Sequence, residues 1–349
     1  MARKTLVNPF ILVLLLVVPC IAAFNVTTLS FNDAYAPLFG FNNIVRSADD
    51  RSVRLILDRS YGSGFISSDM YLHGFFSASI KLPSDYTAGI VVAFYTSNGD
   101  VFEKTHDELD FEFLGNIRGK EWRVQTNMYG NGSTSRGREE RYLLPFDPTA
   151  DFHLYSILWT AQNIIFYIDD IPIREVRRSE VVGGDYPSKP MSLYATIWDA
   201  SNWATAGGRY KVNYKYGPFV SEFSDLALLG CRVDPLQAPP STSRNCTASD
   251  AELAATGLAV MTPERRRAMR QFRERYMTYS FCYDTLRYPE TFSDCDIVES
   301  EKSRFKETGH LRFSGSGSGS SSGGRHRRRY GRRRARVPVA ADAEKQAAM

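Results

Sequence analysis

Three carboxylates alternate with apolar side chains in the segment His106–Phe113, which reads HDELDFEF. At the two-residue period of a β-strand, Glu108, Asp110 and Glu112 share one face, and the residues between them share the other. Carboxylates on a partly buried strand must be paired, hydrated or protonated. Glycoside hydrolysis explains the pattern, because one carboxylate attacks the anomeric carbon and one carboxylic acid protonates the leaving oxygen. A third carboxylate between them would raise the pKa of its neighbours.

Two other interpretations of this segment are a solvated strand face and a divalent-cation site built from carboxylate oxygens. A calcium site usually takes ligands from a loop with a glycine bend and backbone carbonyls, and the segment has no such bend. It also lacks the second histidine of a zinc-binding HExxH helix. We therefore favour glycosidase chemistry, with no metal and no cofactor.

Short β-rich segments separated by Gly, Asn, Asp and Pro precede the acidic segment, at residues 53–57, 74–82 and 89–95. Short strands at this spacing, without long helical periods, predict an all-β sandwich. Residues 121–127 read as the hairpin partner of the acidic strand. Gln125 and Asn127 would share a face there, where they could bind sugar hydroxyls, although polar residues on a strand often only face water.

Aromatic side chains recur between Tyr194 and Trp203 among small and polar residues. Flat aromatic rings stack on the apolar faces of pyranose rings, so these residues suit an open polysaccharide cleft. For Trp198, a place in the sandwich core is an equal alternative. Trp203 lies in a loop-like Asn-Trp-Ala-Thr-Ala-Gly-Gly context, which favours contact with sugar.

The N-terminus indicates secretion. Basic residues at positions 3 and 4 precede an apolar run over residues 10–18 and the small-residue site Cys20-Ile21-Ala22-Ala23. The run is short for a membrane span. Removal of residues 1–23 leaves four cysteines, at positions 231, 246, 282 and 295. In a secreted chain they predict two disulfides, and spacing alone leaves three pairings open.

Charge is divided unevenly along the chain. Residues 24–300 carry 28 Lys/Arg and 35 Asp/Glu, whereas residues 301–349 carry 13 Lys/Arg and 4 Asp/Glu. The acidic part predicts a neutral substrate and no nucleic acid. A helix is expected to begin at Pro263, with Thr262 as its N-cap. Residues 314–324 are only Ser and Gly, and eight arginines follow within residues 325–336, so we expect a disordered tail.

The segment HDELDFEFLG resembles the active-site signature of plant xyloglucan endotransglucosylase/hydrolases, in glycoside hydrolase family sixteen. The resemblance extends from about residue 30 to about residue 295. Its other motifs are QTN at 125–127, GRE at 137–139, PFDPT at 145–149, SLYATIW at 192–198 and NWAT at 202–205. The long loop around Asn131 and the extended C-terminal tail look most like the third subgroup.

This resemblance implies roles for individual residues. Glu108 is expected to be the nucleophile, Glu112 the general acid/base and Asp110 the carboxylate that tunes them. The expected substrate-binding residues are Gln125, Thr126, Asn127, Gly137, Arg138, Glu139, Asn202, Trp203, Gly207 and Arg287. The implied disulfides are Cys231–Cys246 and Cys282–Cys295, each stabilising its segment by roughly 3 kcal/mol. Sequons occur at Asn25, Asn131 and Asn245.

From these observations we expect a signal peptide in residues 1–23 and a jelly-roll β-sandwich with a concave substrate cleft in residues 24–228. A C-terminal extension with both disulfides should occupy residues 229–300, and a disordered tail residues 301–349. The expected activity is retaining xyloglucan endotransglucosylation in the cell wall and apoplast, with xyloglucan chains as donor and acceptor. A xyloglucan hydrolase and a non-catalytic glucan-binding protein are the alternatives. Two interpretations of the Arg-rich tail stay open, a solvated charged tail without a partner and a tether that binds de-esterified pectin.

Overall fold

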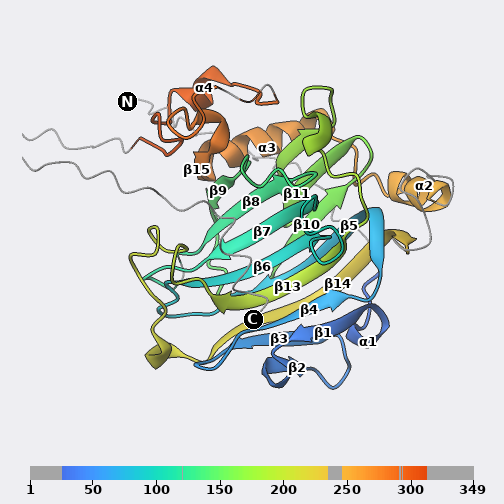
Figure 1. Ribbon diagram of the computed structural model, residues 1–349, viewed down its shortest axis with the longest axis vertical. Coiled ribbons are helices and arrows are strands. Elements are labelled where there is room, and N and C mark those ends of the chain that lie inside the picture. Colours follow the sequence, from blue (N-terminus) through green and yellow to red (C-terminus); the bar gives the residue numbers. More distant parts are fainter. Residues whose placement is uncertain (1–25, 120, 235–245, 291, 293, 313–349) are drawn as a thin grey trace, which may run out of the picture.

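The protein, seen in a computed structural model, is a sandwich of two antiparallel sheets (Figure 1). The structure describes residues 26–119, 121–234, 246–290, 292 and 294–312. Within these residues, the larger sheet has eight strands in the order β1-β4-β13-β6-β7-β8-β9-β15, and the smaller has seven in the order β12-β11-β10-β5-β14-β3-β2. The all-β jelly-roll prediction is confirmed.

The strands of the larger sheet are β1 (Tyr35–Phe39), β4 (Ser63–Ser67), β13 (Ser192–Asp199), β6 (Ile90–Ser97), β7 (Glu108–Leu114), β8 (Arg123–Tyr129), β9 (Glu140–Leu143) and β15 (Met277–Ser280). Those of the smaller sheet are β12 (Ile171–Arg177), β11 (Asn163–Ile168), β10 (His153–Trp159), β5 (Met70–Lys81), β14 (Phe219–Val233), β3 (Ser52–Leu57) and β2 (Ile44–Arg46). The helices are α1 (Phe31–Ala34), α2 (Thr247–Ala255), α3 (Pro263–Tyr276) and α4 (Glu299–Lys302), with 3-10 turns η1 (Phe41–Asn43), η2 (Gly183–Asp185), η3 (Tyr214–Tyr216) and η5 (Phe281–Tyr283).

The core between the sheets settles which face of β7 is buried. Phe111 packs edge-on against Tyr155 of β10 and Phe166 of β11, with ring centroids 5.7 and 5.3 Å apart. Phe113 meets Tyr155 at 4.7 Å. Because side chains alternate along a strand, the carboxylates of β7 must project from the other face of the larger sheet, hereafter the outer face.

The C-terminal segment completes the larger sheet. Helix α3 begins at Pro263, and the hydroxyl oxygen of Thr262 accepts a hydrogen bond from the Arg265 N–H at 3.3 Å, which confirms the predicted cap. Strand β15 then pairs with β9. Both disulfides pair as the resemblance implied: Cys231–Cys246 joins β14 to α2, and Cys282–Cys295 closes the loop after β15.

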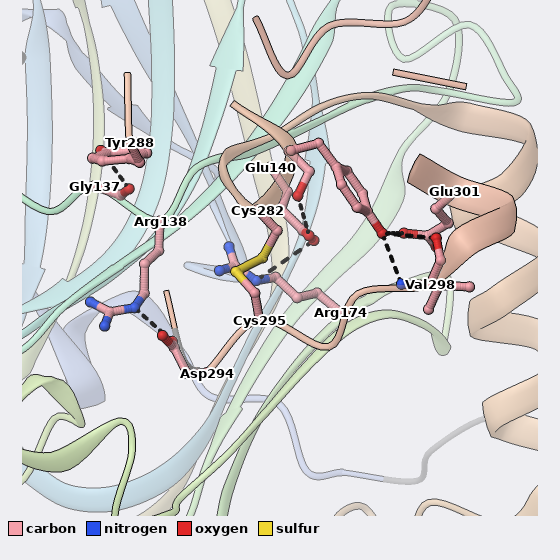
Figure 2. Close-up of a disulfide and its surroundings, with 12 residues drawn as sticks. Gly137, Arg138, Glu140, Arg174, Cys282, Tyr288, Asp294, Cys295, Val298 and Glu301 are labelled. Carbon is pink, nitrogen blue, oxygen red and sulfur yellow. Dashed lines mark hydrogen bonds and ion pairs between the residues drawn. A yellow bond between two sulfur atoms is a disulfide. The ribbon is translucent and has the colours of Figure 1, made fainter. Parts of the chain in front are cut away.

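A buried charge network fastens this segment to the sandwich. Glu140 of β9 accepts hydrogen bonds from Arg273 of α3 at 2.7 and 3.0 Å, and Arg174 of β12 lies 3.7 Å away. Arg273 also binds Glu301 of α4. Figure 2 shows Glu140 and Arg174 beside the Cys282–Cys295 disulfide. Burial raises the pKa of Glu140, but the charges of Arg273 and Arg174 more than offset this and lower it to about 2.

Replacing Glu140 tests this network. Glu140→Gln keeps the shape of the side chain but leaves Arg174 and Arg273 short of negative charge, so we expect a loss of about 3 kcal/mol at pH 7. Since folding depresses the pKa of Glu140, its contribution is complete above the ordinary pKa, near 4.5, and disappears as the pH falls toward 2. Denaturant unfolding at pH 7 and pH 3 should show the variant approaching the wild type at the lower pH.

The matched control is Glu222→Gln, because Glu222 pairs at 3.4 Å with the exposed Arg54. Its stability should change by less than about 0.5 kcal/mol at either pH. Equal losses at pH 7 and pH 3 for Glu140→Gln would contradict the ionic origin of the effect.

Candidate active site

A buried carboxylate fixes the start of β7. Asp107 is fully buried and accepts backbone N–H bonds from Asn131 at 2.7 Å and from Ser188 and Lys189 at 2.8 Å each. The Lys189 ammonium adds a fourth bond at 2.8 Å. Asp107 therefore ties three loops together directly before Glu108. In the two-residue pattern of this segment, Asp107 is a charged residue on the same side as Leu109 and Phe111. The sequence analysis did not recognise its structural role.

The three candidate catalytic residues form a file along β7 on the outer face. Glu108 and Asp110 are 7% and 5% exposed, and Glu112 is half-buried. Glu108 and Glu112 lie four residues apart, about 13 Å at the backbone of an extended strand. A retaining glycosidase needs the two carboxyl groups about 5–5.5 Å apart, so these two side chains must lean toward each other.

Strand β8 places polar side chains beside this file. Asp110 is paired with Asn127, and Glu112 with Gln125. The Gln125 side-chain amide donates to Glu112 Oε2, and its oxygen accepts from Arg141 Nε at 2.6 Å. Because arginine only donates, Gln125 must present its oxygen to Arg141 and its N–H to Glu112.

Arg141 itself lies 5.2 Å from the ring centroid of Tyr279, on β15. A chain of contacts therefore leads from the C-terminal segment to the candidate acid. Sequence reasoning missed Arg141, because only the register of β8 with β9 places it opposite Gln125.

Thr126 faces the other way from its two neighbours. It is fully buried, and both its hydroxyl and its backbone carbonyl accept hydrogen bonds from Arg174, at 3.0 and 3.1 Å. Its predicted contact with substrate stays a prediction, whereas its position on the inner face makes it part of the scaffold.

Tyr129 of β8 is paired with Glu108. Burial raises its pKa, and the nearby charges of Glu139 and Asp110 raise it further. Its hydroxyl therefore stays protonated at physiological pH and can donate a hydrogen bond next to the candidate nucleophile.

The Gly137-Arg138-Glu139 segment connects the larger sheet to the C-terminal loop. The buried Arg138 guanidinium binds Asp294 and Asp185 at 2.9 Å each, and Figure 2 shows its contact with Asp294. Glu139 binds Arg287 at 2.9 and 3.0 Å. The Tyr288 hydroxyl donates to the Gly137 carbonyl at 2.9 Å. The predicted binding residues of this group therefore lie together, held by contacts with the C-terminal segment.

The aromatic residues divide into two pairs on the outer face. Tyr194 stacks on Tyr95 at 5.0 Å, and its hydroxyl donates to Asp100 at 2.7 Å. Trp198 lies 5.9 Å from Trp203, in a small apolar cluster outside the main core. The core alternative for Trp198 is therefore wrong. The buried Nε1 of Trp203 has no hydrogen-bond partner among the described residues.

Two glycines shape the loop that carries Asn202 and Trp203. Gly207 and Gly208 both have positive φ, at 66° and 78°. A Cβ on Gly208 would stand 2.2 Å from the Asn202 carbonyl oxygen, so a larger residue cannot enter without moving the loop. Asn202 and Gly207 themselves are exposed.

Several predicted features lie outside the described residues. They are the signal segment, the Asn25 and Asn245 sequons, and the Ser/Gly and Arg-rich stretch from residue 313. Asn131 is described and exposed. In the part of the chain that the structure describes, no helix is long and apolar enough to cross a membrane. Within those same residues, no cluster of three or more His, Cys, Asp or Glu is arranged to hold a metal ion.

The antiparallel sandwich, with a row of carboxylates and aromatic residues on its outer face, assigns the protein to the glycoside hydrolases as a class. Comparisons agree. Residues 31–216 match the model of glycosyl hydrolases family 16, and residues 247–295 match that of the xyloglucan endo-transglycosylase C-terminus. The chain belongs to the xyloglucan endotransglucosylase/hydrolases of family 16.

Among its relatives, the chain is 62% identical to probable xyloglucan endotransglucosylase/hydrolase protein 30 of Arabidopsis thaliana, over 90% of this chain and 92% of the relative. It is 60% identical to probable protein 29 of the same organism, over 84% of each. A solved prokaryotic β-1,3-1,4-glucanase (lichenase) from a mouse hindgut metagenome is 23% identical, with a TM-score of 0.46, over 59% of this chain and 98% of that one.

Neutralising Asp110 tests the function of the middle carboxylate. Its charge disfavours ionisation of the neighbouring acid, so Asp110→Asn should lower the rate and move the basic limb of the pH–rate profile to lower pH. The measurement is the pH dependence of kcat/KM on soluble xyloglucan. The control is Asp151→Asn, an exposed carboxylate before β10, which should leave the profile in place. An unchanged profile for Asp110→Asn would make Asp110 a structural residue.

Proposed function

We propose that the protein is a retaining xyloglucan endotransglucosylase that cuts the β-1,4-glucan backbone of xyloglucan and joins the new end to another xyloglucan chain. The observation that carries this proposal is the file of three carboxylates on β7, with Gln125 hydrogen-bonded to Glu112. The names of its relatives, xyloglucan endotransglucosylase/hydrolases, supply the substrate.

In the first half-reaction, a carboxylate oxygen of Glu108 attacks the anomeric carbon, while Glu112 gives its proton to the departing 4-oxygen. The products are a glycosyl ester on Glu108 and a free chain end. In the second half-reaction, the 4-hydroxyl of another chain attacks the same carbon and passes its proton to Glu112. The ester bond breaks, Glu108 recovers its charge, and the configuration is retained.

The neighbouring side chains would hold the substrate and orient the acid. Arg141 fixes the Gln125 amide, and that amide holds one oxygen of Glu112. Asn127, next to Asp110 across β7 and β8, would contact sugar hydroxyls. The loop from Asn202 to Gly207 would place the partly exposed ring of Trp203 against a sugar.

Transfer and hydrolysis differ only in whether a sugar hydroxyl or water attacks the glycosyl ester. Transfer predominates when bound sugar excludes water from that ester. We assign the acceptor side to the end of the larger sheet where β9 meets β15. The support is the set of ion pairs from Arg138 to Asp294 and from Glu139 to Arg287, which hold the C-terminal segment against the sheet. A xyloglucan hydrolase remains the second candidate, because water can use the same two carboxylates.

We also propose that the N-terminal segment directs secretion to the apoplast and cell wall. The proposed division of the chain is a signal peptide in residues 1–23, a sandwich in 24–228 and an extension from residue 229. The expected boundary between extension and tail at residue 300 moves to about residue 312, because Glu301 binds Arg273 and Phe305 is buried. Strand β14 continues from Phe219 to Val233, so the sandwich and the extension share that strand.

Incubation with xyloglucan and a labelled xyloglucan oligosaccharide tests the proposal. Label should move into long chains for a transferase, and new reducing ends should accumulate for a hydrolase. Glu108→Gln should abolish both while leaving the circular dichroism spectrum unchanged, since it removes the nucleophile. Neither product with the wild-type protein would leave only a glucan-binding role.

Azide distinguishes the two carboxylate roles. It should rescue Glu108→Ala on an activated substrate and give a product inverted at the anomeric carbon, because azide then replaces the nucleophile. It should rescue Glu112→Ala with configuration retained, since the glycosyl ester still forms. The opposite pattern would exchange the two assignments.

The Arg-rich tail carries a separate proposal, that it tethers the enzyme to de-esterified pectin. Eight arginines in residues 325–336 follow eleven Ser/Gly residues, in a region outside the described residues. A chain ending at Ser314 should keep its activity on soluble xyloglucan but lose retention on pectin-rich walls, because it lacks the arginines. The comparison is made at low salt, since exposed charges are screened within ~8–10 Å at physiological ionic strength. Equal wall retention of the two proteins would refute the tether.

A further inference from the structure

The direction of a bound glucan follows from the two catalytic carboxylates, given the proposed function. Glu108 and Glu112 must flank the scissile bond from different sides. Both belong to β7. The sugar chain that passes between them therefore crosses β7 and its neighbouring strands rather than following one strand.

Strand register defines a path for such a chain from Glu112 to the edge of the larger sheet. Glu112 is paired with Ala93 of β6, and Ala93 with Thr196 of β13. Thr196 is paired with Gly64 of β4, and Gly64 with Phe39 of β1. We call these five residues the Phe39–Glu112 row. In Figure 1 it runs from β7 toward the blue strands β4 and β1, away from α3 and β15.

The side chains in the middle of the row are small, and larger side chains lie on both sides of it. Ala93, Thr196 and Gly64 have small side chains or none. On one side of the row, at a distance of two residues along the strands, Tyr95 is paired with Tyr194 and their rings are stacked. On the other side, also two residues along the strands, Trp198 is paired with Val91 and contacts Trp203.

Phe39 ends the row with an aromatic ring on the outer face. A Cβ added to Gly64 would stand 2.7 Å from Phe39 Cε1 and 2.9 Å from Thr196 Cγ2, so the ring occupies the space that the glycine leaves open. Phe39 is nevertheless only half-buried. Its ring is supported from below by the sheet and still accessible to a ligand.

We propose that Phe39 is a distal sugar-binding residue, whose ring stacks on the apolar face of a pyranose of the same glucan chain that Glu108 and Glu112 act on. Four interstrand steps separate it from Glu112, about 19 Å at ~4.8 Å per step. Several backbone sugars fit in that span. The sequence did not reveal this site, because Phe39 lies 73 positions before Glu112 and only the pairing of the three strands between β1 and β7 aligns them.

Binding to a catalytically inactive protein tests the inference without turnover. In a Glu108→Gln background, calorimetry with xyloglucan oligosaccharides of increasing backbone length should show a rise in affinity, roughly tenfold, at the length that first reaches Phe39. Phe39→Leu fills the space above Gly64 without a flat ring, so that rise should disappear. Phe39→Tyr keeps the ring and should preserve it. Phe152→Leu, at an exposed aromatic residue before β10, is the matched control and should also preserve it.

The outcomes separate this inference from the proposed function. Loss of the rise in Phe39→Leu alone supports the distal site. A rise that persists in Phe39→Leu, or that vanishes equally in Phe39→Tyr, overturns it and makes Phe39 a space-filling partner of Gly64. The wild-type Glu108 protein is assayed for transfer in parallel. If it is inactive and no oligosaccharide binds, the proposed function fails and the distal site fails with it.

Discussion

The pairing of β7 between β6 and β8 is the constraint on which the site depends. It buries Leu109, Phe111 and Phe113 against the smaller sheet and thereby forces the three carboxylates to the outer face. A slip of one residue would bury the carboxylates and expose the aromatic rings, so the hydrophobic core itself enforces the register. The four hydrogen bonds to Asp107 fix the chain directly before the first residue of the strand, Glu108. The same register of this strand therefore determines both the packing of the core and the geometry of the site.

Local patterns predicted what depends on local sequence. The two-residue period of the acidic strand gave its two faces, and Thr262-Pro263 gave the start of α3. The same period bears on one expectation that remains a prediction, the substrate contact of Thr126. Gln125 and Asn127 share a face, so Thr126 between them must point inward, where it binds Arg174. Its place among the expected sugar-binding residues came from the family motif, whereas the strand period indicates a scaffold position.

Contacts between distant strands were beyond prediction. Arg141 orients Gln125 only because β9 pairs with β8, and Phe39 aligns with Glu112 only across the three strands between β1 and β7. Such alignments are properties of sheet order, which a single sequence does not contain. The disulfide pairing was likewise open from spacing and came from the resemblance alone. Arg138 shows the same limit, because its two carboxylate partners, Asp185 and Asp294, lie 47 and 156 residues away in the chain.

The C-terminal segment links stability to catalysis. Glu140 anchors α3 and α4 through Arg273, and the next residue, Arg141, orients Gln125 from the opposite face of β9. Because adjacent residues of a strand point to opposite faces, a displacement of β9 would disturb both at once. Tyr279 of β15 packs against Arg141, so the extension reaches the candidate acid through two side chains. The segment that completes the sheet thus also contributes to how the amide beside Glu112 is held.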